Sequence, residues 1–151
     1  MPKQTMTEVS AISLRIDLPN GSRLGPGKVA LLEAVKVRHS ISAAARQQGM
    51  SYRRAWLLID DMNRAFQDAV VKTFPGRSQA AGASLTPFGE RLVALYRAAE
   101  SHATYAITAE VAGITSVCDR SYGASGGSPD QTAAPAAKAV RTAKQSRGPG
   151  A

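Results

Sequence analysis

The stretch SISAAARQQGMSYRRAW, from Ser40 to Trp56, decides the fold of this chain. It predicts a short helix that Ser40 or Ser42 caps and that Gly49 ends, since serine caps helix N-termini and glycine adopts the left-handed backbone of a helix end. Ser51 then caps a second helix, whose first turn is polar. Two helices joined by a tight glycine-containing turn are the elements of a helix-turn-helix.

Upstream of this stretch, the sequence predicts a strand, a turn and a helix. Apolar and polar residues alternate from Ala11 to Leu18, which indicates a half-buried strand. A turn at 19–21 and a short return strand at 22–24 follow. From Pro26 to near His39, apolar residues recur with the period of an amphipathic helix.

Downstream, the second helix of the opening stretch continues with an apolar stripe of Ala55, Ile59, Met62 and Phe66. A strand at 69–74, a loop at 75–83 and a return strand from 84 then predict a hairpin with a long tip. Thr86 caps a last helix with Pro87 in its first turn, and helical spacing of apolar residues continues to about Ala112.

These elements predict a fold that is mainly α with a small β hairpin: a helix-turn-helix followed by a long C-terminal helix. The expected organisation is a flexible N-terminus at 1–10, the DNA-binding domain at 11–115 and a disordered tail at 116–151. The tail is rich in Gly, Ala and Pro, carries basic residues and lacks core-forming side chains, which is typical of disorder.

The composition limits which class of partner the protein is expected to bind and in which cellular compartment it is expected to act. The 151 residues suit one domain with a tail, and the net charge of +8 favours a polyanionic partner. Cys118 is the only cysteine, so no intramolecular disulfide can form, and neither a leader nor a membrane-spanning run is evident. We expect a cytoplasmic protein without a membrane partner.

The sequence offers no enzymatic site. Asp60 and Asp61 are adjacent on a helix and therefore point about 100 degrees apart, while His39 and His102 belong to no ligand pattern. We expect no catalytic residues, no metal site and no cofactor.

Two segments carry a resemblance to a known family. The segment SISAAARQQGMSYRRAWLLIDDMN, from Ser40 to Asn63, and the segment LTPFGERLVALY, from Leu85 to Tyr96, resemble the N-terminal DNA-binding domain of the ModE family of molybdate-responsive transcriptional regulators. The resemblance covers about 14–99, and LysR-type regulators are more distantly similar. It implies a winged helix-turn-helix and a final helix used for dimerisation. Full-length members continue into a molybdate-binding module, which we do not expect in this chain.

The exposed N-terminal end of a recognition helix reaches base edges in the major groove, and flanking serines and basic wing residues reach phosphates. The candidate DNA-binding residues are Ser40, Ser42, Ser51, Tyr52, Arg53, Arg54, Trp56, Lys72 and Arg77. The simpler interpretations remain open: helix caps for the serines, solvated charge for the basic residues, and packing between the first turn and the core for Trp56.

The last helix carries the candidate dimerisation residues Leu92, Leu95, Ala99, Ala103 and Ile107. They could pack within one protomer, but so long a helix outruns so small a core, which favours a homodimer. A two-fold dimer would place two recognition helices about 34 Å apart on duplex DNA.

The leading hypothesis is a homodimeric, sequence-specific transcriptional regulator, with molybdenum-related genes as the regulon that the resemblance implies. The alternative is a winged-helix interaction module that pairs with a full-length ModE-like regulator and modulates it. The wing tip GRSQAAG at 76–82, where the family has a glycine run with a lysine, motivates this alternative.

Overall fold

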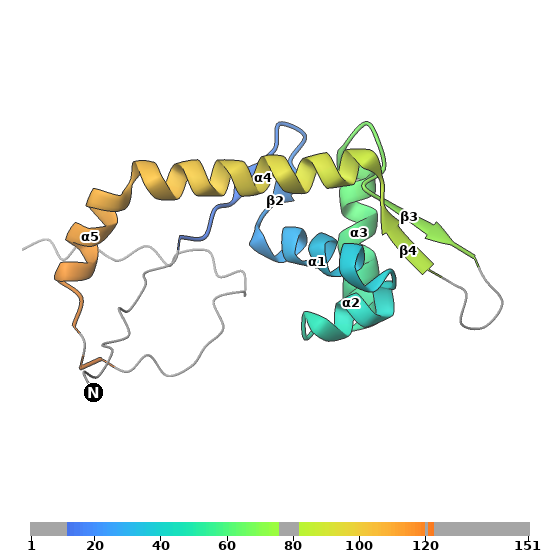
Figure 1. The fold of residues 1–151 in the computed structure, drawn as a ribbon, viewed down its shortest axis with the longest axis horizontal. Helices are drawn as coiled ribbons and strands as arrows, with labels where there is room; N and C mark the ends of the chain where they lie inside the picture. The colour runs from blue at the N-terminus through green and yellow to red at the C-terminus, as the bar shows by residue number, and fades with distance from the viewer. Residues whose placement is uncertain (1–11, 76–81, 120, 123–151) are drawn as a thin grey trace, which may run out of the picture. The chain divides into compact units, whose positions relative to one another are not determined.

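The computed structural model describes residues 12–75, 82–119 and 121–122, and the described residues up to Val117 belong to one compact unit. Its elements are β1 (Ile16–Asp17), β2 (Arg23–Leu24), α1 (Pro26–Arg38), α2 (Ile41–Gln47), α3 (Tyr52–Ala65), β3 (Val71–Phe74), β4 (Gly82–Leu85), α4 (Pro87–Ala106) and α5 (Thr108–Ser116) (Figure 1). The prediction of a mainly α fold with small β elements is confirmed at this level. The predicted flexible N-terminus, and the predicted tail apart from 116–119 and 121–122, lie outside the described residues.

Two small antiparallel sheets flank the helices. In one, Ile16 of β1 pairs with Leu24 of β2. In the other, β3 pairs with β4 from Val71 opposite Leu85 to Phe74 opposite Gly82, as the predicted hairpin requires. The tip of this hairpin, with Arg77, falls outside the described residues.

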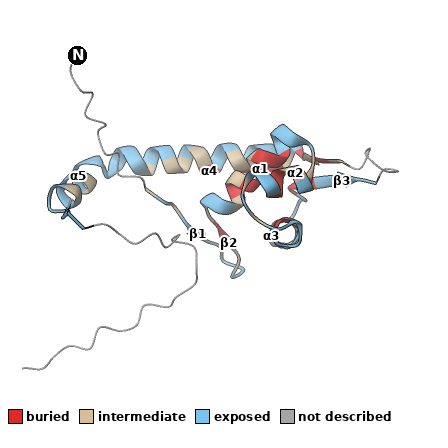
Figure 2. Ribbon diagram, turned by 90° about the horizontal axis from the view of Figure 1, so that it is seen from below, coloured by how far each residue is buried: buried red, intermediate tan, exposed pale blue. Residues whose placement is uncertain are grey.

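The core lies where α1, α2, α3, the β3–β4 hairpin and the first half of α4 meet. α1 supplies the largest group of buried side chains, namely Val29, Leu31, Leu32, Ala34 and Val35. Figure 2 shows buried segments gathered in α1 and α2, whereas the second half of α4 is largely exposed. The recognition-helix candidate α3 contributes Ala55, Ile59 and Met62 to this core, as its predicted stripe requires.

The helix starts of the opening stretch follow from its serines. The Oγ of Ser40 accepts a hydrogen bond from the Ala43 backbone N–H at 3.2 Å, so Ser40, and not Ser42, caps α2. Between α2 and α3, Gly49 adopts φ +65°, and the Met50 N–H closes the turn on the Ala45 carbonyl at 3.0 Å. This connection fixes the start of α3 next to the end of α2.

Two predicted elements differ from the structure. The N-terminal strand predicted over 11–18 is only the two residues of β1, and the Leu14 carbonyl instead accepts a hydrogen bond from the Tyr96 hydroxyl at 2.6 Å. The continuous helix predicted to Ala112 is divided at Ile107, and Figure 1 shows α5 running at an angle to α4. The hydroxyl of Thr108 bonds the Thr104 carbonyl at 2.9 Å, a kind of contact that often bends helices.

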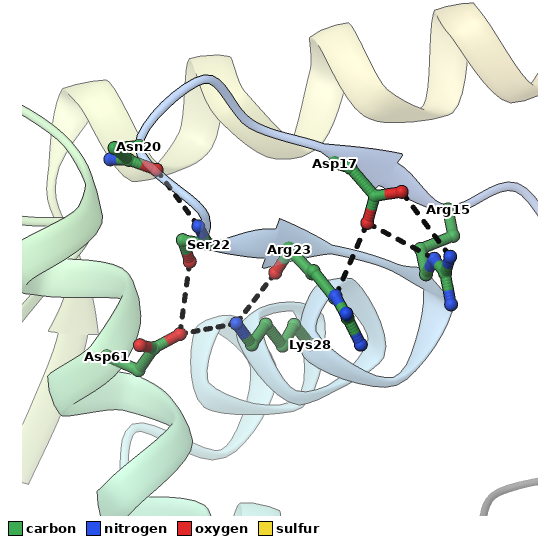
Figure 3. A network of polar contacts seen from close by, with 7 residues as sticks. All are labelled: Arg15, Asp17, Asn20, Ser22, Arg23, Lys28 and Asp61. Carbon is green, nitrogen blue, oxygen red and sulfur yellow. Dashed lines mark hydrogen bonds and ion pairs between the residues drawn. The ribbon is translucent and has the colours of Figure 1, made fainter. Parts of the chain in front are cut away.

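Polar contacts beside the turn between β1 and β2 hold α1 and α3 together (Figure 3). The ammonium group of Lys28 in α1 donates to the Asp61 carboxylate in α3 and to the Arg23 carbonyl at 2.7 Å. The Ser22 hydroxyl donates to the same carboxylate at 3.3 Å. Hydrogen bonding from Lys28 holds the pKa of Asp61 below its usual value, although partial burial opposes this.

A second set of polar contacts connects the end of α3 to β3 and α4. The Asn63 side chain accepts from the Val70 and Val71 N–H groups at 2.8 and 3.1 Å and donates to the Val71 carbonyl at 3.2 Å. Thr86 caps α4 by accepting from the Gly89 N–H at 2.9 Å, and its hydroxyl donates to the Ala69 carbonyl at 2.6 Å. Asn63 therefore has a structural role, because its side chain joins the end of α3 to the start of β3.

An ion pair and a buried tyrosine hold α4 against the rest of the domain. Arg97 in α4 donates through two nitrogens to the two oxygens of Glu33 in α1, each at 2.8 Å, and through a third to Glu100 at 2.8 Å. Hydrogen bonding from Arg97 lowers the pKa of Glu33 despite partial burial. Tyr96 is 2% exposed, and desolvation raises the pKa of its hydroxyl.

Candidate nucleic-acid interface

The first turn of α3 presents polar and basic side chains to solvent. Ser51 caps the helix by accepting from the Arg54 N–H at 3.1 Å. Tyr52, Arg53 and Arg54 follow, and all three are exposed. Because Ala55 is completely buried one position later, the helix cannot rotate to hide this turn. A fixed helix N-terminus with exposed donors is the arrangement that DNA recognition needs.

A hollow of about 390 Å³ lies along this turn. Its lining is Tyr52, Arg53, Trp56 and Leu57. Residues four apart share a helix face, so Tyr52 stands beside Trp56 and Arg53 beside Leu57. The structure thus brings three of the predicted residues together, and Trp56 is 47% exposed rather than closed within the core.

Sequence reasoning missed Leu57, which is 51% exposed at the centre of the outward face of α3. Its spacing of four residues from Arg53 places both side chains on one helix face, and this could have been recognised from the sequence. Leu57 also lies two positions after Ala55, about 200 degrees around the helix from the buried stripe, so the stripe itself would have assigned it to the solvent side.

A second hollow, of about 320 Å³, lies beside α2 and was also not predicted. Arg38, Ala43, Arg46 and Gln47 line it. The guanidinium of Arg38, at the end of α1, donates to the Gln47 side chain at 2.8 Å, so its position is set by α2. Two guanidinium groups around one hollow favour an anionic ligand such as a phosphate.

The other predicted DNA-binding residues lie outside the first turn of α3. Ser42 is exposed in the first turn of α2, whereas Ser40 is half-buried by its capping role. Lys72 is exposed on β3, opposite Ser84 of β4. Arg77 cannot be located, since it lies outside the described residues.

The predicted dimerisation residues fall into two groups. Leu92 is 8% exposed and belongs to the protomer's own core, so it is not available to a partner. Leu95 is 62% exposed and Ile107 is 39% exposed, while Ala99 and Ala103 are half-buried. Tyr105, 87% exposed on another side of α4, was not predicted.

Two kinds of feature are absent from the described residues. Within 12–75, 82–119 and 121–122, no helix combines the length and apolar content needed to cross a membrane. In the same residues, no three His, Cys, Asp or Glu side chains are grouped so that they could hold a metal ion.

The chain is similar to several curated proteins over about half of its length, although no family model matches it. MopB of Rhodobacter capsulatus, a molybdenum-pterin-binding protein, is 47% identical over 81 residues, which are 54% of this chain and 30% of that protein. The molybdenum transport protein ModE of Azotobacter vinelandii is 38% identical over 87 residues, 58% of this chain and 32% of its own length. The DNA-binding transcriptional dual regulator ModE of Escherichia coli K12 is 37% identical over 71 residues, 47% of this chain and 27% of its own.

This similarity confirms the predicted resemblance to ModE proteins at the level of sequence. The chain spans about a third of the length of the curated relatives that it matches.

Proposed function

We propose that this chain is a sequence-specific DNA-binding protein that regulates transcription of molybdenum-related genes. Its relatives support the class: one is named as a DNA-binding transcriptional regulator, and the others carry names that refer to molybdenum. None of these three names denotes an enzyme, which favours a non-enzymatic role. In this proposal α2 and α3 are the helix-turn-helix and the β3–β4 hairpin is the wing.

The observation that carries the proposal is the exposure of Tyr52 and Arg53 at the N-terminal turn of a helix whose opposite face is locked into the core. Arginine in this position can pair through two nitrogens with the O6 and N7 of guanine. No ion pair with a described residue occupies the Arg53 guanidinium. Arg53 is therefore assigned to base recognition, and Tyr52 to the adjacent phosphate or base.

Cations on neighbouring elements would contact the DNA backbone on either side of the bound groove. Arg38 and Arg46 border the hollow beside α2, and Lys72 is exposed on the hairpin. Such contacts fix the orientation of the protein on the duplex without reading sequence. They also make affinity fall as salt rises, because each neutralised phosphate releases counterions.

A homodimer through α4 completes the proposal. Leu95 leaves apolar area in water on a face of α4 that the core does not use. A second copy of α4 packed on this face would remove that area from water, and the two-fold axis would match a palindromic operator.

The proposal is tested by selection from random duplexes. The purified protein is incubated with a pool of random duplex DNA at increasing salt, and the retained fraction is sequenced. A two-fold symmetric motif that is retained at about 200 mM salt is the expected result. Retention without any motif, fading steeply as salt rises, would overturn sequence-specific binding.

A further inference from the structure

We propose that Leu57 and Trp56 form an apolar contact for the C5-methyl group of a thymine, next to the guanine assigned to Arg53. This inference rests on the proposed function, and it names base-reading residues that sequence comparison does not assign. Its starting point is that two large side chains of α3 are half exposed to water. The side of this helix that faces away from the core exposes 51% of Leu57 and 47% of Trp56 to water.

The shape of the surface supports a small apolar ligand group. Tyr52 and Trp56 form one side of the hollow of about 390 Å³, and Arg53 and Leu57 form the other. Three of these four side chains present carbon to the hollow, and the fourth is a cation. A phosphate could accept from Arg53, the Tyr52 hydroxyl and the Trp56 indole N–H, but it would leave Leu57 and the carbon face of Trp56 in water.

The chemistry of the major groove selects thymine as the occupant. Among the base-edge groups in that groove, hydrogen-bond donors and acceptors are common to all base pairs, but the thymine methyl is the one apolar group. The guanidinium of Arg53 makes a polyanion the favoured partner at this hollow, in keeping with the net charge of +8. A duplex with thymine near guanine offers both a negative surface and a methyl group.

The spacing along α3 limits where that thymine lies. Side chains four residues apart on a helix are separated by about 5 to 6 Å, and successive base pairs by about 3.4 Å. The thymine that contacts Leu57 therefore lies within about two base pairs of the guanine that contacts Arg53.

Uracil substitution tests this inference without altering the protein. Each thymine of the selected duplex is replaced in turn by uracil, which removes only the C5-methyl group, and affinity is measured by fluorescence anisotropy. We expect one position in each half-site, within two base pairs of a guanine, to lose about fourfold in affinity, the factor for burial of one methyl group.

Variants then assign the effect to the side chains. Leu57→Ala and Trp56→Ala should weaken binding to the thymine duplex and abolish the difference between thymine and uracil. Val37→Ala, at a side chain that is 70% exposed on α1, is the matched control and should keep the difference.

The outcomes separate the two proposals. A selected motif whose thymines all tolerate uracil would overturn this inference and leave sequence-specific binding intact. Equal loss for thymine and uracil duplexes in Leu57→Ala would also overturn it, since Leu57 would then serve stability or a protein partner. Failure to select any motif would overturn the proposed function, and this inference with it.

Discussion

Asn63 holds the backbone of Val71 from both sides, accepting from its N–H at 3.1 Å and donating to its carbonyl at 3.2 Å. One side chain near the end of α3 thereby determines where β3 leaves the helix. The hairpin that carries Lys72 is consequently held at a fixed position relative to the exposed turn of α3. A recognition helix and a wing must keep such a relation if both are to contact one duplex.

Replacing Asn63 with alanine should destabilise the domain. The change leaves the N–H groups of Val70 and Val71 without their acceptor, and a partly buried polar group without a partner costs about 1 to 3 kcal/mol. Chemical denaturation measures the loss. Gln67→Ala, at an exposed residue just after α3, is the control and should stay within about 0.5 kcal/mol of wild type. Equal stabilities for the two variants would contradict the role given to Asn63.

Gly89→Ala should destabilise the domain more than Gly113→Ala does. A Cβ at Gly89 would collide with the Val70 carbonyl oxygen, so β3 or α4 must shift, at a cost of about 1 to 3 kcal/mol. Gly113→Ala in α5 meets no atom within 4 Å and should be neutral or slightly stabilising. Thermal unfolding of both variants gives the comparison, and a Gly89→Ala protein as stable as wild type would refute the close approach of α4 to Val70.

The ion pair between Glu33 and Arg97 predicts a pH dependence of stability. Its hydrogen bonds lower the pKa of Glu33 in the folded state below the ordinary value of 4.5. The contribution is therefore complete above about pH 4.5 and is lost as pH falls through the lower folded pKa. Both side chains are more than a third exposed, so solvent screening limits the contribution to about 1 kcal/mol at neutral pH.

The measurement compares Glu33→Gln with wild type by denaturation at several pH values. The variant should be less stable at pH 7, and the difference should shrink as the solution is made more acidic than pH 4.5. Glu110→Gln in α5 controls for the loss of one carboxylate. A difference between Glu33→Gln and wild type that does not change with pH would contradict this account.

Leu95→Asp should convert the proposed dimer into a monomer. A carboxylate at the centre of an apolar contact between two α4 helices would be repeated by the two-fold axis, so that two like charges would meet. Sedimentation equilibrium measures the change, and Val37→Asp on α1 is the control for adding an exposed charge. A wild-type protein that is already monomeric would favour pairing of α4 with a longer relative, which adding that relative to the purified chain would test.

The sequence predicted the helices well because their signals are local. Ser51 and Thr86 cap the helices that follow them, as predicted, and Ser40 is the one of the two predicted candidates that caps α2. The apolar stripe of α3 likewise specified which face is buried. Such features depend on residues within one or two turns of each other.

What the sequence could not predict depends on contacts between distant residues. The Leu14 carbonyl is bonded by Tyr96, which lies 82 positions away, and the predicted strand is correspondingly short. Leu92 and Leu95 look alike in the repeating pattern of α4, yet one is buried in the core and the other is 62% exposed. The same limit concealed the hollow between Arg38 and Arg46, which depends on how α1 and α2 pack.

Binding of Arg53→Ala to the selected duplex tests the central claim most directly. Arg15→Ala, whose exposed side chain pairs with Asp17 at 3.3 Å, removes the same charge at a site remote from the first turn of α3. The two variants are measured side by side. Arg53→Ala should lose about 1 to 3 kcal/mol of binding free energy and should discriminate less against other bases at one guanine position, because a bidentate pair is lost. Arg15→Ala should bind nearly as wild type does. Equal affinities for Arg53→Ala and Arg15→Ala, with discrimination unchanged, would contradict the assignment of α3 as the recognition helix.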